Sequence, residues 1–211
     1  MLKNMLTSAK KVGIPMSDVD FYLSNEVPST QQYGTPKFNT LTIEKIKAIL
    51  DAVIKHGEVL YVDADIVFFQ DCRNDVFHRA LTCDGIFQND YSSFCSGFAY
   101  LKRTQPVVDL LYSIVGASEM NKKCNDQQIL NTIFQNFNVF FSVLPHTLYP
   151  NGDVWWKAWK DRKDGIKEKA YMVHNNFIKG YAAKQKRFEE SGLWNIDESI
   201  LDGIPVLEVP K

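Results

Sequence analysis

The stretch from Val59 to Phe69 places two carboxylates inside the most apolar part of the chain. It reads Val-Leu-Tyr-Val-Asp-Ala-Asp-Ile-Val-Phe-Phe, and its β-branched and aromatic residues predict a strand that is buried on both faces. Ionised carboxylates are costly in such a place unless they are paired or bind a cation. Because side chains two residues apart on a strand point to the same side, Asp63 and Asp65 are expected to converge.

Two hard oxygen donors that converge on one point suit Mg²⁺ or Mn²⁺. The pattern therefore indicates a metal-dependent enzyme that acts on a phosphate-bearing substrate. The alternative is a strand end at which Asp63 and Asp65 cap the following turn.

The size and charge of the chain exclude several classes of function. Its 211 residues suffice for one sizeable core, so we expect a single domain over residues 1–211. Lys and Arg number 24 against 25 Asp and Glu, which argues against a nucleic-acid partner.

The four Cys lack Cys-x-x-Cys spacing and are interpreted as reduced thiols of a cytoplasmic protein, the alternative being a secreted protein with two disulfides. No apolar run approaches the roughly 18 residues of a membrane span, so we expect a soluble protein or a domain of a larger one.

Helical and strand patterns alternate, which predicts an α/β fold whose central, mostly parallel mixed sheet is flanked by helices. In such sheets ligands bind beyond the carboxyl ends of the strands, where Asp63 and Asp65 are expected. Residues 150–168 contain three Trp and are expected to form a long surface loop. The expected helices are 2–12, 41–55, 107–115, 126–137 and 179–191, and the expected strands are 20–24, 59–69, 85–87, 98–101, 139–143 and 170–173.

His174 follows an apolar strand and is also expected at a carboxyl end. A neutral imidazole beside Asp63 and Asp65 would complete three protein ligands, and its nitrogen would favour Mn²⁺ over Mg²⁺. Lys179 comes five residues later, before Gly180, and could meet a diphosphate as a point charge. The alternative for His174 is a capping or core role.

Two further polar pairs could contact a sugar donor. Asp126 and Gln127 open an expected helix, where they either face a sugar or only start the helix. Ser96 and Gly97 precede an apolar strand, where they either bring the backbone close to a ligand or form a β-turn.

The remaining candidates are weaker. Gln88 and Asp90 follow a strand and could contact the substrate. Trp155, Trp156 and Trp159 could stack on an acceptor sugar, or they could cover the core.

Taken in order, these pieces resemble the nucleotide-diphospho-sugar transferases of the GT-A fold, over residues 38–194. The Asp-x-Asp motif alone is common, but the ordered set is specific. The matching segments are Lys45–Gly57, Tyr61–Val67, Ser96–Phe98, Asp126–Gln127 with Asn131, Asn151–Gly152, His174–Gly180 and Gly192–Trp194.

The resemblance implies a Mn²⁺-dependent transferase, with Mg²⁺ as the other option, that moves a hexose or deoxyhexose from a UDP-sugar to a hydroxyl group of a glycan or glycoprotein, with retention. The two Asp residues of the motif and His174 would be the metal ligands. Lys179 would approach the diphosphate together with the first Asp, and Asp126 and Gln127 would lie near the donor sugar.

The segments look like those of an N-terminal domain of a multidomain viral protein, which would place the chain in the cytoplasm of the host. One feature departs from the family. Its members usually open with a strand whose end holds the nucleotide base, and this chain begins on the helix after it. We therefore expect that strand to be displaced, or the strand over 20–24 to take over the base contacts.

Two other functions fit parts of the pattern. In a phosphatase of the haloacid-dehalogenase type, Asp63 would be the nucleophile and Asp65 the general acid. That fold needs a later acidic pair after an apolar strand, where this chain has His174-Asn175-Asn176. A sugar-binding module with a residual metal site is the other alternative.

Overall fold

The computed structural model describes residues 1–24, 35–120, 123–160, 168–202, 204 and 206–210. Its central sheet has the strand order β2 (Glu58–Val62), β5 (Ser93–Lys102), β4 (Gly85–Asp90) and β6 (Phe141–Leu144). The β4–β6 pair is parallel, and the β2–β5 and β4–β5 pairs are antiparallel. The α/β class and the mixed sheet are confirmed, but the expectation of a mostly parallel sheet is wrong for these strands. Tyr91 and Ser92 alone connect β4 to β5, and so short a connection joins only antiparallel strands.

The expectation of one continuous strand over residues 59–69 is also wrong. The chain leaves the central sheet after Val62, turns at residues 63–65 and enters a separate sheet at Ile66. That second sheet is the antiparallel pair of β3 (Ile66–Phe68) and β7 (Met172–His174). A third sheet is the parallel pair of β1 (Phe21–Leu23) and β8 (Val206–Glu208). The local apolar pattern could not show the break, because the partner strands lie far away in the sequence.

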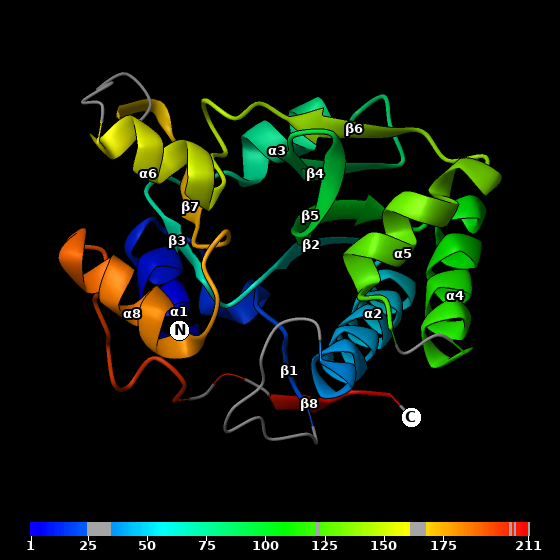
Figure 1. Cartoon of the computed structure of the whole chain (residues 1–211), viewed down its shortest axis with the longest axis horizontal. Coiled ribbons are helices and arrows are strands. Elements are labelled where there is room, and N and C mark those ends of the chain that lie inside the picture. Colours follow the sequence, from blue (N-terminus) through cyan, green and yellow to red (C-terminus); the bar gives the residue numbers. More distant parts are fainter. Residues whose placement is uncertain (25–34, 121–122, 161–167, 203, 205, 211) are drawn as a thin grey trace.

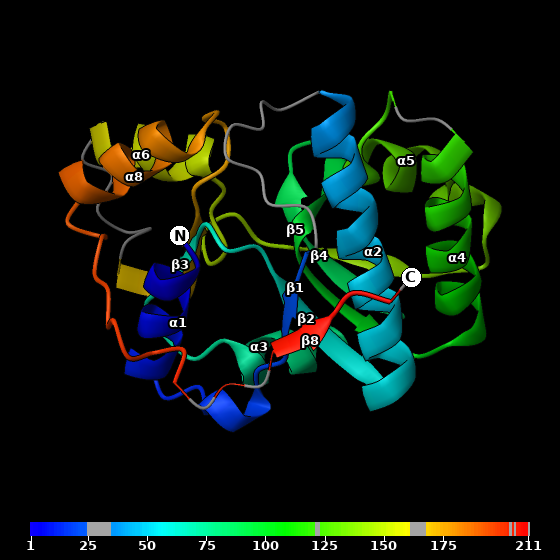
Figure 2. The same cartoon turned by 90° about the horizontal axis from the view of Figure 1, so that it is seen from below.

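One face of the central sheet is covered by α2 (Pro36–His56), α4 (Gln105–Met120) and α5 (Asp126–Ile133), as Figures 1 and 2 show. Helix α2 starts earlier than its apolar pattern predicts, because the Thr35 side chain accepts a hydrogen bond from the N–H of Phe38 and caps the helix. It ends at Gly57, whose φ of 84° suits a glycine. The expected helix over 126–137 is α5 followed by a short 3₁₀ turn, Phe134–Asn136.

The opposite face of the sheet packs against α1 (Leu2–Lys11) and α3 (Arg73–Arg79). Successive residues of β5 face opposite sides of the sheet and so belong to two different cores. Ala99 belongs to the core under α2 and α4, and Phe98 and Tyr100 belong to the core on the other side. A 3₁₀ turn, Met16–Asp18, follows α1.

The expected surface loop over residues 150–168 is largely a helix, α6 (Gly152–Lys160), and residues 161–167 lie outside the described part. Trp155 is 3% exposed and stacks on Phe69 with ring centroids 5.0 Å apart. Trp156 lies under the guanidinium of Arg187, which belongs to α8 (Tyr181–Glu190) and is 4.6 Å from the ring centroid. Trp155 is thus part of a hydrophobic core and Trp156 packs partly buried against it, which agrees with the alternative that these residues cover the core. Trp159 is also part of α6.

Cys72, Cys83 and Cys95 are buried free thiols, in keeping with the reduced state that the sequence predicts for them. Among the described residues, none of the helices has the length and apolar character needed to cross a membrane.

Two glycines in helical surroundings should respond to substitution in opposite ways. Gly57→Ala should lower the free energy of unfolding by about 1 kcal/mol or more, because alanine disfavours the positive φ at this position. Gly116→Ala, inside α4, should raise it by about 0.5–1 kcal/mol, because its Cβ would meet nothing within 4 Å. Urea denaturation of both variants measures the two changes, and equal changes at both positions would contradict the assignment of the helix end.

Candidate functional site

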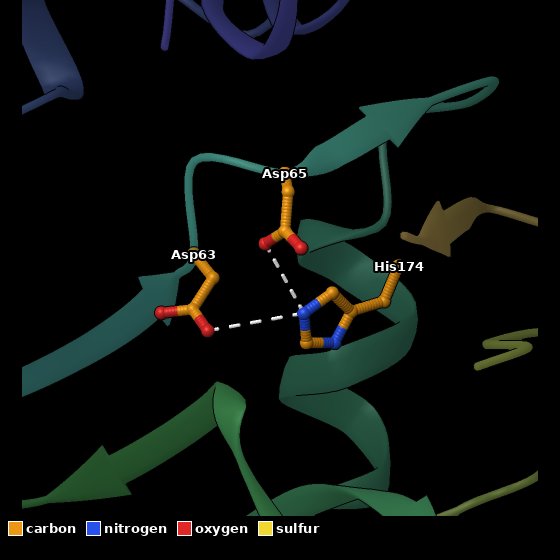
Figure 3. Close-up of side chains that lie close together, drawn as sticks. All are labelled: Asp63, Asp65 and His174. Atoms are coloured by element: carbon orange, nitrogen blue, oxygen red, sulfur yellow. Dashed lines mark ion pairs between the residues drawn. The ribbon is translucent and has the colours of Figure 1, made fainter. Parts of the chain in front are cut away.

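The turn between β2 and β3 gathers three side chains from separate parts of the chain. Asp63 follows β2, Asp65 precedes β3, and His174 is the last residue of β7. In the β3–β7 pair Ile66 lies opposite His174, so the imidazole arrives beside Asp65. His174 Nε2 lies 3.2 Å from Asp65 Oδ1 and 3.8 Å from Asp63 Oδ2 (Figure 3). One ligand atom from each residue lies within 4.8 Å of the others, and we call these residues the Asp-Asp-His cluster.

Gly97 supports the cluster from β5. Its carbonyl oxygen accepts a hydrogen bond of 2.7 Å from the N–H of Asp63, which fixes the chain just after β2 ends. A Cβ at this position would overlap His174 Cε1 and would lie 2.5 Å from Asp63 Oδ2. The close approach of backbone that Ser96 and Gly97 predict is therefore an approach to the side chains of the cluster.

Gln88 contacts the imidazole of His174 at Nδ1, the ring nitrogen that does not face the two carboxylates. Its Oε1 lies 2.8 Å from His174 Nδ1, and its Nε2 donates to the carbonyls of Tyr149 and Pro150 at 3.2 and 3.0 Å. Because carbonyl oxygens can only accept, the amide nitrogen of Gln88 must face them and its oxygen then faces the imidazole. Nδ1 therefore carries a hydrogen, and Nε2 is directed at the carboxylates. Gln88 is fully buried and its side-chain oxygen faces His174, and contact of Gln88 with the donor stays a prediction.

Positive side chains surround Asp65. Lys184 Nζ lies 2.5 Å from Asp65 Oδ2, on the side away from His174. Burial opposes the charged carboxylate, but His174 and Lys184 outweigh it and hold the pKa of Asp65 well below its usual value. Burial also opposes a charged imidazole, yet Asp65 raises the pKa of His174 well above its usual value. The cluster thus attracts positive charge strongly, as a cation site must.

Lys45 of α2 links the cluster to Asp126. Its Nζ lies 2.6 Å from Asp126 Oδ2 and 3.8 Å from Asp63 Oδ1, and it donates to Ser96 Oγ at 3.0 Å. Burial opposes the charged ammonium group, but Asp126 and Asp63 raise the pKa of Lys45 above its usual value. This lysine therefore holds the predicted sugar-facing carboxylate beside the predicted metal ligand.

Asp126 and Gln127 start α5, but neither caps it. Asn125 is the capping residue, in a complete capping box. Gln127 donates from Nε2 to Asp90 Oδ2 at 2.9 Å, and its Oε1 accepts from the N–H of Ser96 at 3.2 Å. Hydrogen bonds from Gln127 thus join the start of α5 to the predicted donor-site residues Asp90 of β4 and Ser96 of β5.

Lys179 and Gly180 are exposed at the start of α8, where Gly180 is the N-terminal flanking residue with φ 86°. The lysine of this helix that reaches the cluster is Lys184. Sequence reasoning missed both Lys184 and Lys45. For Lys45 a signal exists, because it lies four residues before Ile49 on the buried face of an amphipathic helix. For Lys184 no local signal exists, because its contact depends on how α8 packs.

A cavity of about 660 Å³, a size typical of ligand sites, lies beside the β2–β3 turn, where Val62 and Ala64 line it but the three cluster residues do not. Lys45 and Tyr61 line it at this end, and Tyr61 donates from its hydroxyl to Asp63 Oδ1 at 2.7 Å. Residues of the expected strand over 20–24, found as β1, also line the cavity. The base contacts of that strand stay a prediction.

The family model described as nucleotide-diphospho-sugar transferase matches residues 3–188. The chain is 26% identical over 204 residues to a UDP-galactose:fucoside alpha-3-galactosyltransferase of Dictyostelium discoideum, a match that covers 82% of this chain and 31% of that protein. It is 27% identical over 198 residues to UDP-D-xylose:L-fucose alpha-1,3-D-xylosyltransferase 1 of Arabidopsis thaliana, which covers 81% of this chain and 54% of that protein. The chain thus spans about a third to a half of the length of these relatives.

Two solved structures share the fold. A glycosyltransferase involved in the glycosylation of the major capsid of PBCV-1 matches with a TM-score of 0.60 at 12% identity, over 90% of this chain and 92% of that one. Galactosyltransferase LgtC, solved with donor and acceptor sugar analogs, matches with a TM-score of 0.52 at 12% identity, over 97% of this chain and 96% of that one.

The role of Gln88 can be separated from donor contact. Gln88→Met should lower the affinity for Mn²⁺ alone about tenfold, because the imidazole loses the acceptor that orients it. Calorimetric titration of Mn²⁺ measures this, and Val53→Ala, a fully buried residue of α2, serves as a control for loss of stability alone. Unchanged Mn²⁺ affinity with weaker UDP binding would instead favour the donor-contact interpretation.

Proposed function

Because the chain belongs to the nucleotide-diphospho-sugar transferase family and has the α/β fold of the GT-A glycosyltransferases, we propose that it transfers a sugar from a UDP-sugar to a hydroxyl group of a glycan, with Mn²⁺ as cofactor. The observation that carries the proposal is the Asp-Asp-His cluster at the β2–β3 turn. Family membership also removes the main reason for the phosphatase alternative, in which Asp63 is a nucleophile.

The cluster fits a divalent metal by its chemistry. Two carboxylates and one imidazole nitrogen form a donor set that suits Mn²⁺, and Mg²⁺ less well. Gly97 leaves the space beside His174 and Asp63 free of any Cβ. When bound, the metal supplies positive charge that stabilises the departing diphosphate.

The residues of the chain around the cluster have separable tasks in this proposal. Gln88 holds His174 in one orientation, and Lys45 holds Asp126 beside Asp63. Lys179, two residues before α8 begins, and Lys184, in the first turn of α8, would contribute positive charge near the diphosphate. Asp126, with Gln127 anchored to the β4–β5 hairpin, would face the donor sugar.

The relatives support a class of acceptor more clearly than a donor. Their names give different donors, UDP-galactose and UDP-D-xylose, but the same kind of acceptor, a fucoside or L-fucose. We therefore propose a glycan that ends in a 6-deoxyhexose such as L-fucose. Their alpha products agree with retention, because these UDP-sugars carry the sugar in α linkage. The cytoplasmic location and the viral origin stay predictions.

Binding of UDP tests the donor site directly. Calorimetric titration of UDP should show binding with Mn²⁺ and none with EDTA. Asp65→Asn should abolish the Mn²⁺-dependent binding while the protein stays folded, and Asp109→Asn, an exposed carboxylate on α4, should leave it unchanged. No UDP binding by the unaltered protein in either condition would overturn the proposal, and assays on phosphate monoesters would then test the phosphatase.

The role of Asp126 is tested by separating turnover from binding. Asp126→Asn should lower turnover about 100-fold and leave the affinity for UDP nearly unchanged, because its charge acts at the sugar and not at the nucleotide. Transfer rates at saturating UDP-sugar and calorimetry with UDP give the two numbers. A lower melting temperature with normal turnover would show that Asp126 only supports the start of α5.

A further inference from the structure

Two exposed aromatic side chains flank strands that carry predicted site residues, and neither belongs to a hydrophobic core of the described chain. Tyr91 lies at the β4–β5 turn, and Phe177 lies three residues after His174. Each is 53% exposed, and their rings meet edge to face with centroids 6.0 Å apart. Exposed aromatic surface beside polar catalytic candidates is typical of a ligand site.

The backbone at both positions is held in a conformation that aromatic residues rarely adopt. Tyr91 has φ 62° and Phe177 has φ 57°, the only two non-glycine residues with positive φ among those described. Such conformations persist when the surroundings hold them, and they gather at ligand sites. Here they direct two rings from separate loops to the same place.

Besides Phe177, two side chains hold Tyr91 in place. Its hydroxyl donates a hydrogen bond to the Asp153 carboxylate of α6, and its ring meets the imidazole of His146 edge to face at 5.4 Å. The preceding residue, Asp90, accepts the hydrogen bond from Gln127. The ring therefore lies one residue from Asp90, whose hydrogen-bond partner Gln127 is predicted to lie near the donor sugar.

Phe177 is fixed through the residue before it. Asn176 accepts a hydrogen bond of 2.6 Å on its side-chain oxygen from the N–H of Gly152, and its carbonyl accepts from Arg187 at 3.1 Å. A Cβ at Gly152 would overlap the Asn176 carbonyl, so the loop after β7 lies tightly against α6. Phe177 is thus held at a fixed place relative to His174.

On the basis of the proposed transferase function, we propose that Tyr91 and Phe177 form an acceptor platform, in which the acceptor pyranose ring stacks on the face of one aromatic ring and packs against the other ring, which stands at 79° to the first. The C–H face of a pyranose ring matches an aromatic surface, and the methyl group of a 6-deoxyhexose adds apolar area that a hydroxymethyl group lacks. Tyr91 directly follows Asp90, the hydrogen-bond partner of Gln127, and Phe177 follows His174 by three residues. An acceptor on this platform would present its hydroxyl group towards the donor sugar.

The test removes each ring without disturbing the backbone. Asparagine tolerates positive φ, so Tyr91→Asn and Phe177→Asn take away the aromatic surface at little conformational cost. Tyr112→Asn removes a tyrosine on α4 that is 57% exposed and serves as the matched control. The acceptors are methyl α-L-fucoside and methyl α-L-galactoside, which differ only in the methyl or hydroxymethyl group at C5. The donor is the UDP-sugar that the unaltered protein hydrolyses fastest.

Each ring-removing variant should raise KM for the fucoside about tenfold, and should leave UDP-sugar hydrolysis in the absence of acceptor unchanged. The unaltered protein should prefer the fucoside about fourfold over the galactoside, and the variants should lose that preference. Phe177→Tyr should keep both properties.

Two failures can be told apart. Unchanged KM and preference in both variants, with normal hydrolysis, would overturn the platform and leave the proposed function standing. Absence of both hydrolysis and transfer with every UDP-sugar would overturn the proposed function, and the acceptor platform with it.

Discussion

Between β2 and β3 the chain passes from the central sheet into the β3–β7 sheet. The rest of the site depends on this crossing. Asp63 is held by the backbone of Gly97 in the central sheet, and Asp65 is held by the β3–β7 pair, where its carbonyl accepts from the N–H of Asn175 at 2.9 Å. Two carboxylates one residue apart are thereby anchored to different sheets. The turn at Ala64 therefore sets the distance between the two carboxylates. The pairing of β3 with β7 places His174 beside Asp65.

The buried carboxylates of the site require cationic partners, and the resulting ion pairs add little to the stability of the fold. Asp65 and Asp126 are 7% and 3% exposed, and removing water from carboxylates costs several kcal/mol each unless cations replace it. Lys184, Lys45 and His174 provide that replacement. Because an ion pair of this kind is at best weakly stabilising, the arrangement is better explained by function than by folding. It keeps Asp65 ionised and in place beside His174.

The sequence predicts the participants in the cluster but not how they meet. Asp63, Asp65 and His174 were identifiable because charged or titratable residues at the ends of apolar strands converge in α/β folds. The geometry differs from the prediction, since no local pattern can tell one long strand from two short strands in separate sheets. Trp155 and Trp156 were misplaced for a related reason, because an amphipathic helix of nine residues carries too few turns to stand out from a loop. The orientation of Gln88 and the reach of Lys184 depend on contacts 86 and 119 residues away, so no single-sequence pattern contains them.

The positions of the site residues suggest how donor and acceptor preferences could change independently. Asp63 and His174 lie at strand ends and Gly97 lies within β5, where a change of position would disturb the sheets themselves. Tyr91 and Phe177 lie in the β4–β5 turn and in the loop after β7, which can alter without repacking either core. On this argument a family can keep one metal site while its surface loops select different sugars. Relatives that share a fucose acceptor but differ in donor would then be expected to resemble one another around these two loops and to differ where the donor sugar meets α5.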